Sequence, residues 1–391
     1  MPSKKVNTIL VNRSRYHYTF MIALICICVL LSACQTLPEP AVQSSRQPTP
    51  APSVEVSPTP SQSPQQALTP AIKPTLTSTP ASASIPASSI NPNRPVLAFY
   101  YMWYAPSDWC SCHMSDLPTI QYTSSDETTI ARQVSWATRA GITGFISSWW
   151  GPGDKTDSNF AKLLASSATL ENATGSRFAS AVYVENNAPA LQGTTNMIHA
   201  LQYVIAHYVN DPHYFHWHGK PVIFFASPIV GNGRTLSTWS FIRSQVDPQD
   251  QEVWSAEGTY LSALSVFDGI HLFSAGYWGI LHGDMAAVDQ GFRSQIDAYN
   301  SAHHTQKIWA AGVLPGYDDT RVPGRTGTYI VPRNNGATYR TSWMAAMASN
   351  PDWITITTFN EWFEGAMIEP SIHYGNQYLD LTAQYAKLWH G

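Results

Sequence analysis

Between residues 94 and 391, short apolar runs alternate with longer segments in which apolar residues recur at helical spacing. The apolar runs are rich in β-branched and aromatic residues, which is typical of buried strands. We predict eight strands: Arg94–Tyr104, Ile142–Trp150, Phe178–Glu185, Pro221–Ala226, Glu252–Ala256, Gly269–Ala275, Lys307–Leu314 and Trp353–Phe359.

The intervening segments predict helices, and Ser125 or Asp126 is suited to cap the first of them. Eight strand-helix units over this length predict a single (β/α)8 barrel, although the pattern is weakest around the short fifth strand. An open doubly wound sheet would show the same alternation, but no Gly-rich phosphate turn follows the first strand. The expected helices are Glu127–Ala140, Ser158–Glu171, Asn196–Val209, Ser237–Val246, Met285–Ala302, Tyr339–Ser349 and Gln377–Trp389.

The first 93 residues have a different pattern. Residues 1–33 combine basic residues with the apolar run Phe20–Leu31, which is too short to span a bilayer, and they predict a signal peptide. The sequence Leu31-Ser32-Ala33-Cys34 resembles a bacterial lipobox, in which Cys34 becomes the lipidated first residue. An ordinary cleavage site with an incidental cysteine and a short core helix are the alternatives.

Residues 34–93 consist largely of Pro, Ser, Thr and Ala and cannot bury a core. Such a tract forms an extended, semi-rigid spacer. We therefore expect a bacterial cell-surface lipoprotein that is anchored to the membrane through Cys34 and carries one folded domain, residues 94–391, as a monomer.

Charged residues are sparse, at 12% of the chain, whereas apolar residues make up 44%. The net charge is −4, and four basic residues, Lys4, Lys5, Arg13 and Arg15, lie in the predicted signal peptide. The remaining chain is therefore more acidic, and it has no basic stripe. This composition supplies one large core and argues against a nucleic-acid partner.

Cysteine use leaves one question open in the folded domain. Cys26 and Cys28 fall in the signal peptide, so Cys110 and Cys112 remain. These two can be free thiols or a strained disulfide. A metal site that includes His113 is disfavoured because two further ligands at metal spacing are missing. We expect neither a metal nor a cofactor.

Acidic and aromatic residues gather at the predicted strand ends, where a (β/α)8 barrel has its active site. Glu361 and Glu364 follow the last strand three residues apart, and a helical turn there would place them on one face. Two adjacent carboxyl groups can cleave a glycosidic bond, and aromatic rings suit the faces of sugars. Two alternatives to a catalytic site remain. The acids can be placed there because a helix N-terminus attracts negative charge, and each aromatic ring can simply pack in the core. The residues at the other strand ends are Tyr100, Tyr101, Trp103, Tyr104, Trp149, Trp150, Glu185, Tyr277, Trp278, Tyr317, Asp318 and Asp319.

Five segments, in the correct order, resemble glycoside hydrolase family 99, the endo-acting α-mannosidases and α-mannanases. Residues Phe359–Glu369, FNEWFEGAMIE, resemble the family's FNEWHEGTQIE, and Tyr100–Tyr104 resembles its YYPWY. Ser148–Gly153 matches SWWGPG, Val184–Asn187 is similar to IEPY, and Pro315–Thr320 is similar to the PGY-acid-DT segment.

The resemblance implies a retaining endo-glycosidase that hydrolyses internal α-mannosidic linkages of a mannan-like polysaccharide without a metal. It implies that Glu361 acts as a base on the substrate's own 2-hydroxyl, giving a 1,2-anhydro sugar. Glu364 would protonate the leaving oxygen and then activate water. The implied substrate-binding residues are Glu185, Tyr101, Tyr104, Trp149, Trp150, Tyr317, Asn360 and Trp362.

Departures from the family pattern bear on the substrate. Phe363, Ala366 and Met367 replace His, Thr and Gln beside the acids, and we expect them to change which sugar is cut because subsite contacts set sugar identity. A hydrolase of another α-glycan therefore stays open. A carbohydrate-binding lipoprotein without turnover would keep the aromatic residues but would not need the acid pair.

Overall fold

The computed structural model describes residues 90–229, 234–281 and 283–391. The predicted signal peptide, Cys34 and the linker as far as residue 89 lie outside the described residues. Within those three ranges, no helix combines the length and the apolar character that crossing a bilayer requires.

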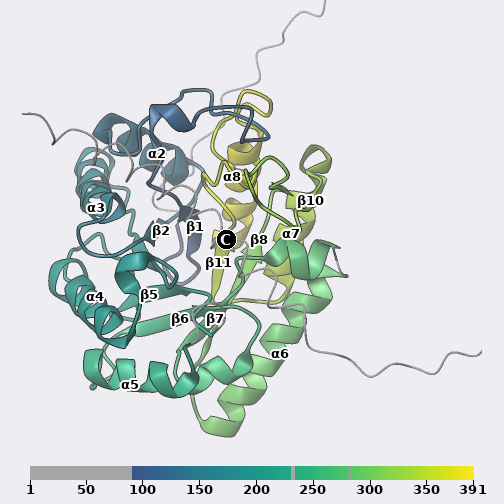
Figure 1. Cartoon of the computed structure of the whole chain (residues 1–391). Helices are drawn as coiled ribbons and strands as arrows, with labels where there is room; N and C mark the ends of the chain where they lie inside the picture. Colours follow the sequence, from purple (N-terminus) through teal and green to yellow (C-terminus); the bar gives the residue numbers. More distant parts are fainter. Residues whose placement is uncertain (1–89, 230–233, 282) are drawn as a thin grey trace, which may run out of the picture. The chain divides into compact units, whose positions relative to one another are not determined.

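Eight parallel strands close into a barrel, which confirms the predicted (β/α)8 architecture (Figure 1). The ring order is β3-β2-β1-β11-β8-β7-β6-β5, and the pairing of β3 with β5 closes it. The strands are β1 Val96–Tyr100, β2 Gly144–Trp149, β3 Ala181–Glu185, β5 Lys220–Ala226, β6 Val253–Glu257, β7 Gly269–His271, β8 Ile308–Val313 and β11 Trp353–Ile356.

Helices surround the barrel (Figure 1). Asp126, one of the two predicted capping residues, caps the first helix. Its side chain accepts hydrogen bonds from the N–H groups of Thr128 and Thr129. The described helices are α2 Glu127–Arg139, α3 Lys155–Thr174, α4 Thr194–His207, α5 Leu236–Val246, α6 Met285–His303, α7 Ala337–Ala348 and α8 Gln377–His390.

The structure corrects the sequence prediction in several places. β1 ends at Tyr100 rather than at Tyr104, and β7 ends at His271 rather than at Ala275. A short 3-10 helix, Leu261–Ser265, takes the position of an α-helix between β6 and β7, which explains the weak pattern there. The last strand ends at Ile356 rather than at Phe359, and residues 362–365 form a turn rather than a helix. Three short strands are additional: β4 His216–Trp217, β9 Tyr317–Asp318 and β10 Ile330–Val331.

Aromatic side chains fill the interior of the barrel. The ring of Phe99 lies 4.9 Å from that of Tyr183, and the ring of Phe224 lies 5.3 Å from that of His271. His271 is fully buried, and its Nδ1 is 2.9 Å from the hydroxyl of Ser255. Burial lowers the pKa of His271 to about 3, so it is a neutral core residue.

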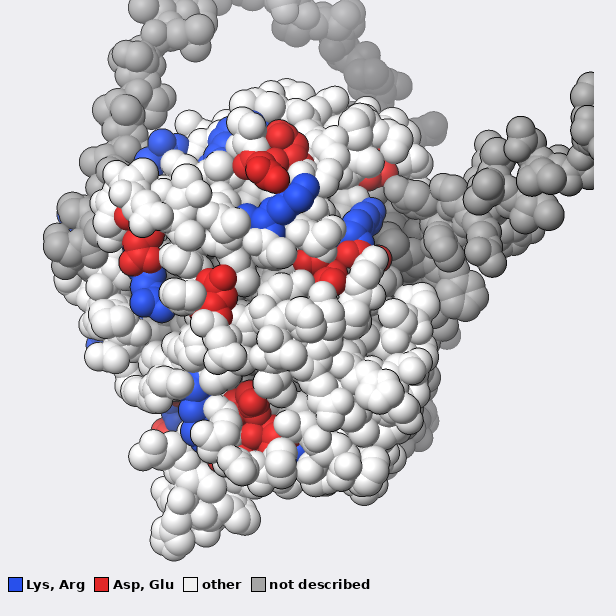
Figure 2. All heavy atoms as spheres, turned by 90° about the vertical axis from the view of Figure 1, so that its left-hand side faces the viewer, with Lys and Arg blue, Asp and Glu red and all other residues white. Residues whose placement is uncertain are grey.

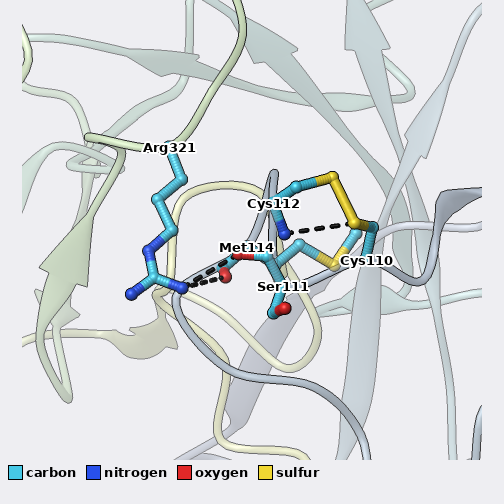
Figure 3. The surroundings of a disulfide bond; sticks show 5 residues. All are labelled: Cys110, Ser111, Cys112, Met114 and Arg321. Carbon is cyan, nitrogen blue, oxygen red and sulfur yellow. Dashed lines mark hydrogen bonds between the residues drawn. A yellow bond between two sulfur atoms is a disulfide. The ribbon is translucent and has the colours of Figure 1, made fainter.

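The question about the two domain cysteines is settled by a disulfide between Cys110 and Cys112 (Figure 3). Arg321 holds the same loop by donating hydrogen bonds to the carbonyl oxygens of Ser111, at 2.9 Å, and Met114, at 3.2 Å. The loop after β1 is thereby tied to the loop after β9. In the described parts of the chain, no group of three or more His, Cys, Asp and Glu side chains could hold a metal ion.

Charges on the surface are scattered. On the face shown in Figure 2, acidic and basic side chains lie singly or beside each other among uncharged residues. This distribution follows from the low charged content of the chain.

Asp289 on α6 gives a prediction about stability and pH. It is fully buried, and neither carboxyl oxygen has a hydrogen-bond partner among the residues with described positions. Burial raises its pKa to about 8, so the folded state favours the protonated acid. The stability that this proton provides is complete below the unfolded pKa, near 3.9, and is lost as the pH rises to about 8.

We therefore expect Asp289→Asn to unfold at higher denaturant concentration than the wild type at pH 8. Between pH 5 and pH 8 its advantage should grow by on the order of 3–4 kcal/mol. Asp297→Asn, on an exposed part of the same helix, is the control and should show little change with pH. An Asp289→Asn advantage of equal size at both pH values would contradict this explanation.

Candidate active site

A pocket of about 240 Å³ opens where the barrel strands end at their carboxyl termini. Four carboxyl groups line it: Glu185, Glu257, Glu361 and Glu364. Aromatic rings make up much of the remaining wall and include Tyr101, Trp103, Trp150, Tyr277, Trp278 and Tyr317.

The four carboxyl groups come from opposite sides of the barrel. Glu361 and Glu364 follow β11, whereas Glu185 ends β3 and Glu257 ends β6. In the ring of strands, β3 and β6 flank β5, and β5 lies opposite β11. A ligand in the pocket is therefore placed between two pairs of carboxyl groups.

The backbone turn after β11 and a tyrosine hold Glu361. Its N–H donates to the hydroxyl of Thr358 at 2.7 Å. Its Oε1 accepts from the Tyr104 hydroxyl and from the N–H of Phe363, each at 3.2 Å. The side chain is almost completely buried, and this burial, followed by the negative charge of Glu364, raises the pKa of Glu361 well above its usual range.

Glu364 is held by an ion pair that the sequence analysis did not find. Arg325 donates to Glu364 Oε1 at 2.9 Å and to Asp319 Oδ2 at 3.0 Å. The same nitrogen lies 3.0 Å from the hydroxyl of Tyr317. Arg325 belongs to the loop between β9 and β10, so its position depends on the path of a loop that no residue pattern specifies.

Glu185 lies on the opposite wall. Its Oε1 accepts a hydrogen bond from Ser148 at 2.7 Å, and Trp150 Nε1 donates to the same serine hydroxyl at 3.1 Å. Burial raises the pKa of Glu185 to about 8, although the Ser148 hydrogen bond opposes this effect. The negative charges of Glu257 and Glu364 raise it further.

Glu257 is the fourth carboxyl group, and the sequence analysis missed it. The predicted strand stopped at Ala256, whereas β6 continues to Glu257. Burial raises its pKa. Glu185 was predicted because it is an acid at the end of a barrel strand. The same pattern identifies Glu257 once the strand is extended by one residue.

The predicted site residues divide into two groups. Tyr101, Trp150, Tyr317, Glu185, Glu361 and Glu364 line the pocket. The other four lie behind its wall: Tyr104, Trp149, Asn360 and Trp362.

Three contacts show what the buried group does. Asn360 Oδ1 accepts from the N–H of Tyr101 at 2.7 Å, which fixes the strand end that carries Tyr101. Trp149 is fully buried, and its Nε1 donates to Asp157 at 3.0 Å. Trp362 Nε1 donates to Glu369 at 3.1 Å. These residues position the wall and do not line the cavity.

Comparison with known proteins adds to this geometry. The model of glycosyl hydrolase family 99 matches residues 104–389. Glycoprotein endo-alpha-1,2-mannosidase of Mus musculus is 22% identical over 296 residues, which are 68% of this chain and 62% of the mouse protein. A glycoprotein endo-alpha-1,2-mannosidase-like protein of Danio rerio is 32% identical over 133 residues, which are 28% of this chain and 30% of that protein. The chain thus spans less than two thirds of the length of these relatives.

A solved structure shows the same fold. The endo-alpha-mannosidase of family 99 from Bacteroides thetaiotaomicron superposes with a TM-score of 0.63 at 21% identity, covering 77% of this chain and 98% of the other. Because the family model extends over nearly the whole folded domain, the chain belongs to glycosyl hydrolase family 99.

Proposed function

We propose that this protein is a retaining endo-glycosidase that hydrolyses internal α-mannosidic linkages of a mannan-like polysaccharide. The observation that carries the proposal is the placement of Glu361 and Glu364 in one pocket lined with aromatic rings. Carboxyl groups can bind sugar hydroxyls while rings stack on sugar C–H faces. The endo-alpha-1,2-mannosidase names of the mouse and other relatives support the choice of sugar.

In the first step of the proposed reaction, Glu361 takes the proton of the sugar 2-hydroxyl. The 2-oxygen forms a bond to C1 while the glycosidic C1–O bond breaks, and Glu364 gives its proton to the leaving oxygen. The product is a 1,2-anhydro sugar. In the second step Glu364 takes a proton from water, which attacks C1, and Glu361 returns its proton to the 2-oxygen as that bond to C1 breaks.

Each of the two acids has one oxygen available for proton transfer, because its hydrogen bonds within the described residues all go to Oε1. A raised pKa makes the carboxylate of Glu361 a stronger base toward a weakly acidic hydroxyl. Arg325 occupies Oε1 of Glu364, and Oε2 has no hydrogen-bond partner among the described residues. Oε2 is therefore the oxygen that carries the transferred proton.

Amide substitution tests the two acids. We expect Glu361→Gln and Glu364→Gln each to slow the release of oligosaccharides from yeast-type mannan by about 10²–10⁴-fold or more, because the amide cannot exchange the proton. The thermal midpoint should change little. Glu127→Gln, on the exposed start of α2, is the control. Near wild-type turnover by either variant would refute its role, and binding of mannan by the wild type without release would indicate a binding protein.

The pH dependence of the reaction gives a second prediction. Glu361 must be ionised to act as a base, so kcat/KM should rise as the pH rises through its elevated pKa. The charge of Arg325 lowers that pKa. Arg325→Gln should therefore move the acid limb of the pH profile to higher pH. A profile that falls in amplitude without moving would show that Arg325 has no electrostatic effect on Glu361.

We also propose that the chain is exported and anchored to the membrane at the bacterial cell surface by a lipid on Cys34, with the Pro-rich segment to residue 93 as a spacer. The support is the sequence Leu31-Ser32-Ala33-Cys34 after a basic and apolar leader. We expect labelling by a fatty-acid analogue and membrane partitioning, both lost in Cys34→Ala. Ser32→Thr serves as a control for substitution within the segment. Wild-type partitioning of Cys34→Ala would exclude the anchor.

A further inference from the structure

Glu257 lies outside the segments that resemble the family, and the proposed reaction does not use it. Its Oε2 accepts three hydrogen bonds: 2.9 Å from the Tyr183 hydroxyl, 2.8 Å from the Ser227 N–H and 2.9 Å from the Ser227 hydroxyl. These donors come from β3 and from the residue after β5. One oxygen of this carboxyl group is therefore fixed by two neighbouring parts of the barrel.

The backbone of Ser227 adapts to this contact. Ser227 has a φ of 40°, in the left-handed region that residues other than glycine rarely adopt. Such a conformation persists where surrounding contacts hold it, and it is common at binding sites. Here it lets both the N–H and the hydroxyl of one residue reach Glu257.

The other oxygen of Glu257 is the one that a ligand can reach. Oε1 has no hydrogen-bond partner in the described part of the chain, and Glu257 lines the pocket. Because Oε2 accepts three hydrogen bonds, a proton on this carboxyl group resides on Oε1. The exposed oxygen can then accept or donate, which matches a sugar hydroxyl because a hydroxyl does both.

The position of Glu257 determines which side of a sugar it meets. If the proposed function holds, the C1–C2 edge of the reacting sugar lies against Glu361 and Glu364. The far side of the ring, with C4 and its neighbours, then faces the wall formed by Glu185 and Glu257, which flank the strand opposite β11.

We propose that Glu257 is a specificity-determining residue that binds a hydroxyl on the far side of the reacting sugar through Oε1. Tyr183 and Ser227 are positioning residues, because they act through Glu257. This inference rests on the proposed function for the orientation of the sugar.

Glu257→Gln is the sharpest variant for testing this. An amide oxygen can still accept from Ser227 and Tyr183, but the atom that faces the pocket becomes an NH₂ donor. We expect weaker binding of a manno-oligosaccharide, by about 10- to 100-fold, measured through the fluorescence of pocket tryptophans such as Trp150 and Trp278. Glu252→Gln, a buried acid just before the other end of β6, is the matched control and should bind as the wild type does.

Monodeoxy analogues of the oligosaccharide separate contact from structure. If Glu257 binds one hydroxyl, the penalty of Glu257→Gln disappears for the analogue that lacks that hydroxyl and persists for the others. A penalty that persists across the whole series, or no penalty at all, would overturn the proposal.

Binding and turnover are measured separately so that the two proposals can fail separately. Wild-type binding without hydrolysis would refute the glycosidase and leave the Glu257 comparison valid. Hydrolysis with equal binding by wild type and Glu257→Gln would refute the role of Glu257 and leave the glycosidase intact. Absence of binding to any neutral oligosaccharide would refute the sugar class for both.

Discussion

Burying a carboxyl group removes its hydration, which costs free energy unless protein groups replace the lost hydrogen bonds. The structure of the pocket depends on which protein groups do so. Each of the four acids is anchored through one oxygen. Glu361 is held by Tyr104 and a backbone N–H, Glu364 by Arg325, and Glu185 by Ser148. The second oxygen of each has no hydrogen-bond partner among the described residues and belongs to a side chain that lines the cavity. The anchors fix the geometry, and the remaining oxygens perform the chemistry or bind the ligand.

Strand pairing in the barrel supplies the anchors of two of the four acids, Glu185 and Glu257. Ser148 on β2 pairs in register with Tyr183 on β3, which brings the serine hydroxyl to Glu185 two residues further on. The closing pairing sets Glu185 of β3 beside Ala226 of β5, and Ser227 follows at once. A slip of one residue in either pairing would turn these side chains to the other face. The ring of parallel strands therefore determines which donors meet Glu185 and Glu257.

The sequence was sufficient for the architecture and for three of the four acids. Alternating strand and helix patterns predicted the (β/α)8 barrel, and the rule that strand ends carry the site led to Glu185, Glu361 and Glu364. It was not sufficient for the neighbours of those acids. Trp149 and Trp150 are adjacent and equally aromatic, yet Trp150 lines the pocket while Trp149 is buried against Asp157. Arg325 comes from a loop whose path depends on tertiary contacts.

The residues that depart from the family pattern lie behind the pocket wall, close to the two acids that follow β11. Phe363 stacks on Tyr104 with ring centroids 5.7 Å apart, and Ala366 and Met367 are buried. The carbonyl oxygen of Met367 accepts a hydrogen bond from Arg333. None of the three lines the pocket, and Phe363 belongs to the turn that carries Glu364. Direct discrimination between sugars then belongs to side chains that reach the cavity, and the proposed role of Glu257 locates it on the wall opposite that turn.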